Sequence, residues 1–565
     1  MKVTIDEVPV YFPHPEIHPE QLRYMHYLKT VLDRKSHGIL QMPKNKGKSS
    51  ALISFITSYR LWKPENLQMK LIYCARNLEE TENILSELKT IYQLQRHFLG
   101  DAANMLAIGF ATRMNKLCIN STITEFSISD EFVDSKCLGC TASWIRELAL
   151  HNTNINICSY FEKYQVDRPV LPPGVYTIED LHELGEDEQN DFCPYFVAID
   201  ALRTANVVVI CGYNYLLNPK YAGIISSKLM DESIVVLDDA EDILEVCKTS
   251  LSVAVSMHTL TSTSLFVKEM RLQLESFNAN DPDRLRAEYD RLLQGLTRNG
   301  DDLPPSDVWR AHPALPADVL VQPMPEDIRS ASNFLTALQH LIGYLKPMLS
   351  CEDVQDERSL LILVERLQPH LNLQSLRLFY ERFHSLISTL KVKNPAHLHC
   401  SDARVLCDFA TMLGIYAQSS EFRIRRGPRG MLEHAPDVLC QYALQICCDD
   451  PSLAMKVVLD RFQSVVITAT TGTSDSLGRF PQILKFQPIV CRPLKLKLVY
   501  KSRLVAHLHL HQNWMVGLEA HIDQKLMAGL KAHIVDLTDF ALHQKLVPGL
   551  EAQIVHMANF GLDQK

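Results

Sequence analysis

Five short apolar runs rich in β-branched residues recur along the chain, each flanked by turn residues or by the start of a helical pattern. Apolar runs without polar alternation predict strands that are buried on both faces, as in a parallel sheet. Helical patterns lie between the early runs, at 50–59 and 79–91. Strands and helices in alternation predict an α/β layer. The five runs are Gly38–Leu40, Leu71–Cys74, Val207–Ile210, Ile234–Leu237 and Ser464–Thr468.

The uneven spacing of these runs predicts that the sheet is interrupted by two insertions. Residues 75–206 separate the second run from the third and contain several cysteines. Residues 238–463 separate the fourth run from the fifth and are expected to be mostly helical. One helix is expected at Arg329–Leu345, where apolar residues recur on one face. The segment Asn299–Pro325 is rich in Pro and Asp and is expected to be a loop.

The composition is that of a folded protein. The chain has 565 residues, with 46% hydrophobic and 22% charged residues, and a chain of this length forms about three to four domains. These values exclude a wholly disordered chain, a collagen-like fibre and a small disulfide scaffold. No apolar run approaches the ~18 residues that a bilayer-spanning helix needs, so no membrane partner is expected. The N-terminal MKVTIDEV lacks the apolar stretch of a secretory signal.

Charge and cysteine content limit the partners and the compartment. The net charge is −9, so any nucleic-acid binding must come from local basic patches. Fifteen cysteines without a visible signal sequence favour the cytosol or the nucleus over a disulfide framework. Cysteines that are grouped in one region would suggest a bound metal.

A candidate phosphate loop follows the first predicted strand. The strand runs into MPKNKGKSS and then into a helical pattern, which is the layout of a P-loop. Backbone N–H groups and the helix N-terminus would hold phosphate oxygens, Lys48 would reach the β- and γ-phosphates, and Ser49 would ligate Mg²⁺. The strict pattern has a glycine where Met42 stands, so a chance Gly-Lys-Ser tripeptide is the alternative. The residues assigned to phosphate binding are Lys44, Asn45, Lys46, Gly47, Lys48 and Ser49.

An acidic box, Asp238-Asp239-Ala240-Glu241, follows the strand Ile234–Leu237. A carboxylate at the end of a buried strand can hold Mg²⁺ through water, and the next carboxylate can orient the attacking water. Asp238 and Asp239 are therefore the candidate catalytic residues. The alternative is a helix N-cap followed by a solvated acidic first turn.

Six segments occur in the order seen in one helicase family. They are YFPHPEIHPEQLRYM, MPKNKGKS, LIYCARN, ANVVVICGYNYLLNP, VVLDDAED and RFQSVVITATTGTS. Over roughly residues 1–490 the chain resembles the XPD-type DNA helicases. The resemblance implies an ATP-dependent 5′→3′ DNA helicase of the transcription and excision-repair factor TFIIH.

The resemblance also implies cofactors, partners and a compartment. The cofactors are ATP with Mg²⁺ and a 4Fe–4S cluster, and Gln21 joins the nucleotide-binding residues. The partners are single-stranded DNA and the TFIIH core and kinase-assembly subunits, in the nucleus. The implied fold is α/β, with a single RecA-like parallel-sheet motor domain, an iron–sulfur insertion and a mainly helical arch insertion.

The family holds its cluster with four cysteines in the first insertion. The matching positions here are Cys118, Cys137, Cys158 and Cys193. Four thiolates on iron is the expected chemistry of such a cluster, and the alternative is buried free cysteine, a common core residue. Cys140 is a spare thiol nearby.

The resemblance is imperfect at the nucleotide site. Asn45 replaces a glycine of the family's loop, Asp239 replaces the glutamate that positions water, and Glu241 replaces a histidine that links hydrolysis to movement. Arg76 is retained. No sequence like the family's second RecA-like domain is recognised after Phe486, so weak or absent unwinding is expected of a chain that still binds ATP and DNA. The alternatives are a non-catalytic TFIIH-type interaction module and a truncated paralogue or product without a stable role.

Four further features have weaker interpretations. The basic run at 423–429 predicts either phosphate contact or a solvated loop, and 492–503 alternates basic and apolar residues like an exposed strand. Tyr195 matches a family aromatic that stacks on a base, although Ile199 stands where that pocket has an arginine. The histidines of 507–511 are candidate zinc ligands, but no carboxylate or cysteine lies adjacent to them. Related segments at 517, 529 and 549 predict a weakly ordered or duplicated tail, or else a short helical array.

These observations predict six segments. They are motor domain 1–104, iron–sulfur insertion 105–200, motor domain 201–246, helical arch 247–436, motor domain 437–490 and repeat-containing tail 491–565.

Overall fold

The computed structural model describes most of the first 493 residues, which lie within one compact unit, Met1–Leu494. Several predicted features fall outside the described residues: Lys44 and Asn45 of the loop, the segment 299–324, the histidines at 507–511 and the repeat tail. The described ranges are 1–43, 46–125, 130–187, 191–226, 228–280, 325–350, 357–368, 371–389, 398–428, 442–471 and 478–493.

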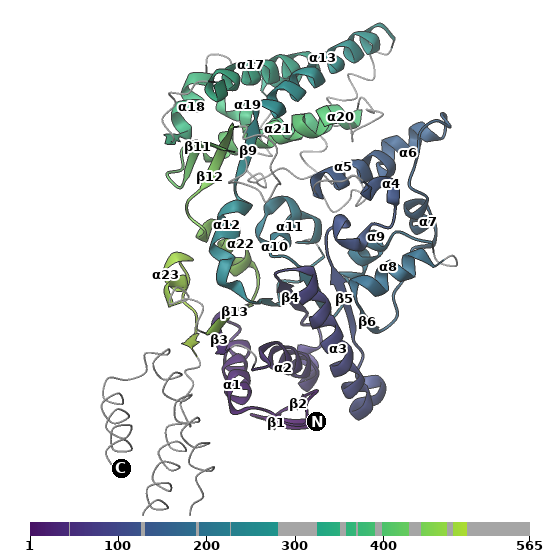
Figure 1. The fold of residues 1–565 in the computed structure, drawn as a ribbon, viewed down its shortest axis with the longest axis vertical. Coiled ribbons are helices and arrows are strands. Elements are labelled where there is room, and N and C mark those ends of the chain that lie inside the picture. Colours follow the sequence, from purple (N-terminus) through teal and green to yellow (C-terminus); the bar gives the residue numbers. More distant parts are fainter. Residues whose placement is uncertain are drawn as a thin grey trace, which may run out of the picture. The chain divides into compact units, whose positions relative to one another are not determined.

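An eight-stranded, all-parallel sheet forms the centre of the α/β part (Figure 1). Its strand order is β14-β3-β13-β8-β4-β7-β5-β6. The five predicted strands are confirmed as β3, β4, β7, β8 and β13, and the α/β class is confirmed with them. The bounds are β3 Gly38–Pro43, β4 Leu71–Ala75, β5 Leu106–Phe110, β6 Gly174–Tyr176, β7 Val207–Cys211, β8 Ile234–Leu237, β13 Ser464–Thr471 and β14 Val490–Pro493.

Helices cover both faces of this sheet because successive side chains of a strand point to opposite sides. In β7, Val207 and Val209 belong to one apolar core and Val208 and Ile210 to the other. The first core is completed by α1, α2 and α3, and the second by α9, α10, α12 and α22. The bounds are α1 Pro19–Asp33, α2 Lys48–Trp62, α3 Leu78–Leu99, α9 Pro194–Ala201, α10 Asn214–Leu217, α12 Ile243–Ser250 and α22 Ser452–Arg461.

An antiparallel hairpin of β1 (Lys2–Ile5) and β2 (Val8–Tyr11) precedes α1. It packs on α2, where the hydroxyl of Ser58 accepts a hydrogen bond from the Tyr11 backbone N–H at 3.1 Å. The remaining short elements of the α/β part are η1 Pro64–Asn66, η2 Gly100–Ala102, α11 Pro219–Ser226, η4 Ala240–Asp242 and α23 Phe480–Ile483.

The chain between β5 and β7 contains the grouped cysteines and is built mainly from short helices. Strand β6 returns from it to the edge of the sheet, beside β5. The bounds are η3 Arg113–Leu117, α4 Ser121–Thr124, α5 Asp130–Thr141, α6 Ser143–Ala149, α7 Ser159–Asp167 and α8 Ile178–Glu186.

The chain between β8 and β13 is mainly helical, as expected, but it also contains a four-stranded antiparallel sheet in the order β10-β11-β12-β9. The helix expected at Arg329–Leu345 is confirmed by α17, whose predicted apolar face is buried. The bounds are β9 Val253–Ser256, α13 Met257–Asn280, α16 Glu326–Arg329, α17 Ala331–Ser350, β10 Glu357–Ser359, α18 Leu360–Leu367, α19 Leu373–Arg377, α20 Phe379–Thr389, α21 Leu398–Tyr416, β11 Phe422–Pro428 and β12 Tyr442–Cys448.

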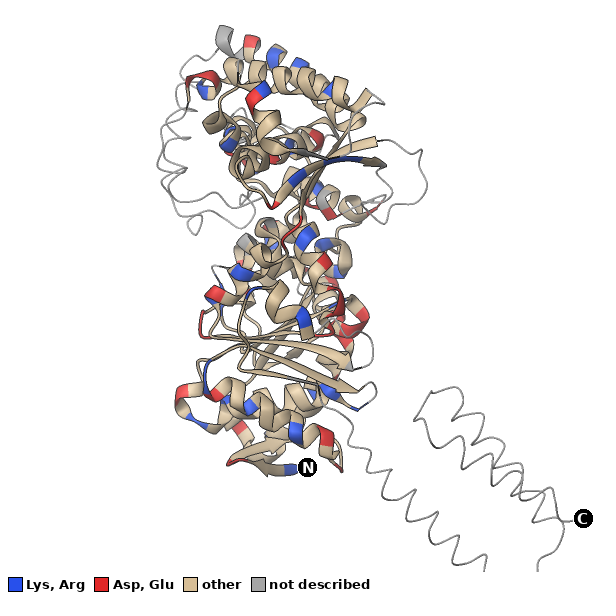
Figure 2. Ribbon diagram, turned by 90° about the vertical axis from the view of Figure 1, so that its left-hand side faces the viewer, with Lys and Arg blue, Asp and Glu red and all other residues tan. Residues whose placement is uncertain are grey.

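The basic run at 423–429 is not the expected loop over its described residues, since 423–428 belong to β11 (Figure 2). Arg423 and Arg425 both pair with Asp449, the second at 3.4 Å. The guanidinium of Arg426 lies 4.4 Å from the ring centre of Tyr442. The basic side chains therefore have structural partners within the antiparallel sheet.

Within the ranges that the structure describes, no helix is both long enough and apolar enough to cross a bilayer.

Candidate functional site

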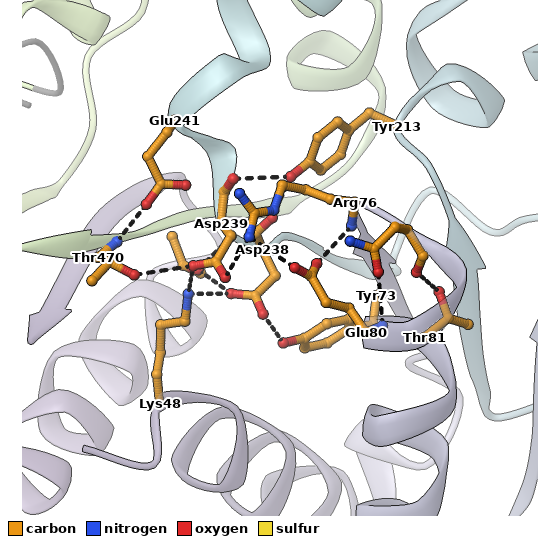
Figure 3. Close-up of polar contacts among 12 residues, drawn as sticks. Lys48, Tyr73, Arg76, Glu80, Thr81, Tyr213, Asp238, Asp239, Glu241 and Thr470 are labelled. Carbon is orange, nitrogen blue, oxygen red and sulfur yellow. Dashed lines mark hydrogen bonds and ion pairs between the residues drawn. The ribbon is translucent and has the colours of Figure 1, made fainter. Parts of the chain in front are cut away.

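Polar side chains from four parallel strands meet where those strands end (Figure 3). Lys48 follows β3, Arg76 follows β4, Asp238 follows β8, and Thr468 lies near the end of β13. The carboxyl ends of parallel strands lie at one edge of the sheet, and ligands of open α/β sheets bind at that edge. The structure thus brings together residues that are up to about 400 positions apart in the sequence.

The backbone of the phosphate loop turns into α2 at Gly47. Gly47 is the N-cap residue and has φ 66° and ψ 46°, a left-handed conformation that favours glycine. A Cβ at this position would lie 2.4 Å from Nε2 of Gln21. The Gln21 amide donates to the Gly47 carbonyl at 3.1 Å and accepts from the His18 backbone N–H at 2.9 Å. Gln21 therefore lies against the loop, next to the residue that begins the turn.

Lys48 lies between the two carboxylates of the acidic box. Its Nζ is 2.8 Å from Oδ1 of Asp238 and also donates to Asp239. The side chains of Lys48 and Asp238 are only 11% and 9% exposed. Burial opposes the charge on Lys48, but Asp238 and Asp239 outweigh it and raise the pKa of Lys48. Burial likewise opposes the charge on Asp238, but Lys48 lowers the pKa of that carboxyl. Both groups stay charged at neutral pH.

Two hydroxyl groups fix the Asp238 carboxylate. Thr468 donates to one oxygen and the fully buried Tyr73 donates to the other. Burial and the charge of Asp238 raise the pKa of Tyr73 well above its usual value, so the phenol remains a donor. Ser49, in the first turn of α2, also interacts with Tyr73. The carboxylate is therefore held in one orientation beside Lys48.

Asp239 has a positive φ of 50° and contacts more than one partner. Its Oδ2 lies 3.6 Å from the guanidinium of Arg76, and the Thr470 hydroxyl donates to its Oδ1 at 3.3 Å. Arg76 also pairs with Glu80 at 2.8 Å (Figure 3). Asp239 precedes the short helix η4 but makes no capping hydrogen bond with its side chain. These contacts argue against the capping alternative for the acidic box.

Glu241 connects the acidic box to β13. Its carboxylate accepts a hydrogen bond from the backbone N–H of Thr470 at 2.9 Å. Lys46, the remaining described loop residue, is partly buried.

The four cysteines matched to an iron–sulfur site line one pocket in the insertion after β5. Cys118, Cys137, Cys158 and Cys193 all border it, and all four are buried free thiols. The amide of Asn120 donates to Sγ of Cys158 at 3.4 Å. Arg113 also lines the pocket, and hydrogen bonds and positive charge beside thiolate sulfurs suit an anionic iron–sulfur cluster. The residues present therefore fit four-thiolate ligation.

The thiols of this pocket influence one another electrostatically. Burial, with the neighbouring Cys137, raises the pKa of Cys118 to about 12, and burial raises the pKa of Cys193 well above its usual value. Metal binding needs thiolates, so such thiols would release their protons on binding iron.

Among the described residues, no three His, Cys, Asp or Glu side chains are grouped tightly enough to hold a single metal ion. A cluster differs in that each thiolate binds its own iron, so the sulfurs need not converge on one point.

The base-stacking role predicted for Tyr195 is wrong for this structure. Its side chain is 2% exposed, and the guanidinium of Arg113 lies 3.8 Å from its ring centre. Ile199 is also buried. The ring therefore lines the cysteine pocket and packs against Arg113 rather than offering a surface for a base.

Two domain families match successive parts of the chain. DEAD_2 matches residues 73–260, and the helical and beta-bridge domain matches residues 273–486.

Comparison with curated proteins gives matches along most of the chain. It is 42% identical over 502 residues to the general transcription and DNA repair factor IIH helicase subunit XPD of Arabidopsis thaliana, covering 88% of this chain and 64% of that protein. It is 34% identical over 501 residues to the subunit of the same name from Dictyostelium discoideum, covering 88% of this chain and 62% of that protein.

Solved structures give a weaker match. A chain described as XPD_Helicase has a TM-score of 0.41 and 13% identity, covering 85% of this chain and 62% of that chain. A score at that level supports no conclusion about the fold.

The chain spans less than two thirds of the length of the curated relatives that it matches. The order of the two domain families and the identity over 88% of the chain confirm the resemblance inferred from the six sequence segments. The chain is an XPD helicase homologue that carries the DEAD_2 domain followed by the helical and beta-bridge domain.

Proposed function

We propose that this chain binds ATP with Mg²⁺ and single-stranded DNA as an XPD-type component of a TFIIH-like assembly, and that it unwinds duplexes weakly or not at all. The observation that carries the nucleotide site is the position of Lys48, 2.8 Å from Asp238 at the carboxyl edge of the parallel sheet. A cation for phosphate and a carboxylate for Mg²⁺ are the two groups that such a site requires.

Each residue of the site has a proposed role. Lys48 binds the β- and γ-phosphates, and the backbone from Lys44 to Gly47 encloses them. Ser49 and Asp238 hold Mg²⁺, directly or through water. When nucleotide enters, Lys48 would exchange its contacts with Asp238 and Asp239 for phosphate oxygens. Asp238 would then be free to hold Mg²⁺, which would supply the positive charge that balances this carboxylate.

Weak hydrolysis follows from Asp239. In the proposed mechanism its carboxylate orients the attacking water, but the side chain is one methylene shorter than glutamate. A displacement of about 1 Å can reduce a rate by ~10²-fold. Asp239 also contacts Arg76 and Thr470, and these contacts would compete with the attacking water for its carboxylate oxygens.

We also propose that Cys118, Cys137, Cys158 and Cys193 hold a 4Fe–4S cluster. The support is their shared pocket, with Asn120 and Arg113 beside the sulfurs. Such a cluster would supply thiolate–iron bonds that cross-link the four chain segments around the pocket.

We also propose the division of the chain into the six segments predicted from the sequence.

The partners and compartment are proposed from the relatives. Those proteins are named as subunits of general transcription and DNA repair factor IIH, which suggests TFIIH core and kinase-assembly subunits as partners, and the nucleus as the compartment. A non-catalytic interaction module or a truncated paralogue is the second candidate, favoured by the Asp239 and Glu241 substitutions.

One purification separates these candidates. The 565-residue chain is prepared without oxygen, and fluorescent ATP and a short labelled single strand are titrated separately, followed by a turnover assay. Binding of both ligands with slow turnover supports the proposal. If neither ligand binds while TFIIH subunits are captured, the chain is an interaction module. Rapid unwinding by the chain alone would overturn the proposed impairment.

Lengthening one side chain should increase hydrolysis. We expect Asp239→Glu to raise kcat for ATP by roughly tenfold, within the ~10²-fold that a 1 Å displacement can cost. Phosphate release at saturating ATP and Mg²⁺ measures it. The control is Asp239→Asn, which keeps the size but removes the charge and should not exceed the parent rate. Equal rates for Asp239→Glu and the parent would show that another step limits turnover.

A further inference from the structure

The thiol of Cys140 has no role in the four-cysteine site, although it lies beside two of its members. Cys137 and Cys140 are three residues apart on α5, and side chains at that spacing are neighbours on one helix face. The backbone carbonyl of Cys140 accepts a hydrogen bond from the backbone N–H of Cys158 at 3.1 Å. The helix thus keeps Cys140 next to Cys137, and this hydrogen bond keeps it next to Cys158.

Two further observations place the Cys140 side chain near the pocket. It is a free, partly buried thiol that packs against the same apolar core as the four cysteines. Its charge interactions are with Cys137 and Cys158. Thr141, the next residue, lines the pocket, so the last turn of α5 borders the space that a cluster would fill.

We propose that Cys140 is a reserve iron ligand of this pocket, an inference that rests on the proposed 4Fe–4S cluster. When the thiolate of Cys137 or Cys158 is lost, the Cys140 thiol releases its proton to solvent and its sulfur binds iron in place of the missing ligand. The exchange is a ligand substitution, and no electron is transferred. Gly139 makes the last turn of α5 easier to adjust, since glycine lowers helix stability relative to alanine.

The other two cysteines lie on different segments. Cys118 follows η3 and Cys193 is the N-cap residue of α9. Cys140 belongs to α5 and touches the Cys158 segment, so it can replace a ligand there but not at Cys118 or Cys193. The proposal therefore predicts that the pocket tolerates loss of Cys137 or Cys158 but not loss of Cys118 or Cys193. Without a reserve ligand, loss of any of the four should have the same effect.

Iron and sulfide content tests this asymmetry. Each of the four cysteines is changed singly to serine in the full chain, with and without Cys140→Ser, and iron, acid-labile sulfide and visible absorption are measured without oxygen. We expect Cys137→Ser and Cys158→Ser to retain most of the iron and to lose it when Cys140→Ser is added. Cys118→Ser and Cys193→Ser should lose it in either background.

A second measurement does not depend on removing a primary ligand. The unsubstituted chain and Cys140→Ser should contain equal iron at the start, but an iron chelator should bleach Cys140→Ser about tenfold faster, the lower end of what loss of a supporting group costs a metal site. Cys491→Ser is the matched control because it removes an exposed thiol from β14. It should bleach at the parent rate.

Different results would overturn the cluster proposal and the Cys140 proposal. If the parent chain has no iron and no visible absorption, the cluster proposal fails and this inference fails with it. If the parent chain has a cluster but all four single variants lose iron equally, or Cys140→Ser bleaches no faster than Cys491→Ser, only the role of Cys140 is overturned.

Discussion

Replacing Lys48 by alanine is expected to abolish ATP binding. Lys48 is the buried cation at the carboxyl edge of the sheet, and its Nζ is within reach of Asp238 and Asp239. Removing it deletes the donor to two phosphates and leaves two carboxylates that repel them. Hydrogen bonds to charged groups contribute about 1.5–3 kcal/mol each, so losing two corresponds to roughly 10²–10⁴-fold in Kd. Titration of a fluorescent ATP analogue measures this change.

The control for Lys48→Ala is Lys456→Ala, which removes an exposed lysine from α22 and should leave the Kd unchanged. Breaking a buried ion pair can destabilise a protein by about 3–5 kcal/mol, so thermal unfolding is recorded for each variant. Lys48→Arg keeps the charge and the contact with Asp238, but its planar guanidinium is no equivalent of an ammonium at a phosphate. A folded Lys48→Arg or Lys48→Ala variant with unchanged affinity would contradict the phosphate-loop hypothesis.

Apolar runs make most of the strands recognisable without their partners, although the fully buried β5, Leu106–Phe110, is not among the predicted strands. Strand β7, Val207–Cys211, is apolar throughout because both of its faces are covered. Strand β6 has only three residues, Gly174–Tyr176, all partly buried, so its sequence carries little signal. In β11 the three arginines resemble a basic loop, and its partner β12 begins only at Tyr442. Long-range pairing of that kind leaves no periodicity in either segment.

Charged residues of the nucleotide site that follow a strand could be predicted from the sequence. Residues of the site that lie within a strand could not. Asp238 and Lys48 follow recognisable strands, and the carboxyl ends of parallel strands share one edge. Tyr73 and Thr468 sit inside apolar runs and are ordinary strand residues by type. Their role becomes visible only from the pairing register of the sheet. Leu237 of β8 pairs with Ile467 of β13 on one side and with Cys74 of β4 on the other. Thr468 therefore follows the residue that pairs with Leu237, directly beside Asp238.

The departures in the acidic box combine into one arrangement. Asp239 contacts Lys48 and Arg76, and Glu241 contacts the backbone of Thr470. A histidine at 241 would be able to donate a hydrogen bond, whereas Glu241 accepts one from β13. These acidic side chains therefore fix the box against its neighbours.

Replacing Cys193 by serine is expected to remove the cluster and loosen the insertion that contains it. Cys193 ends the last of the four segments around the pocket, and it begins α9, whose side chains pack on the sheet. Without iron, burial raises the pKa of the remaining Cys118 to about 12, so the thiols stay protonated and nothing cross-links the segments. Structural metal sites contribute on the order of 10 kcal/mol to folding. Iron and sulfide should fall to background, and proteolysis within 113–193 should accelerate by well over tenfold.

Cys211→Ser is the matched control for Cys193→Ser, because Cys211 is a buried cysteine at the end of β7 that does not border the pocket. It should retain iron and resist proteolysis like the parent chain. Loss of iron from both variants would mean that any buried substitution unfolds this region, and the experiment would then count against a specific ligand role for Cys193. Iron retained by Cys193→Ser together with full protease resistance would contradict four-cysteine ligation, because the pocket would then keep its iron and its structure without this thiolate.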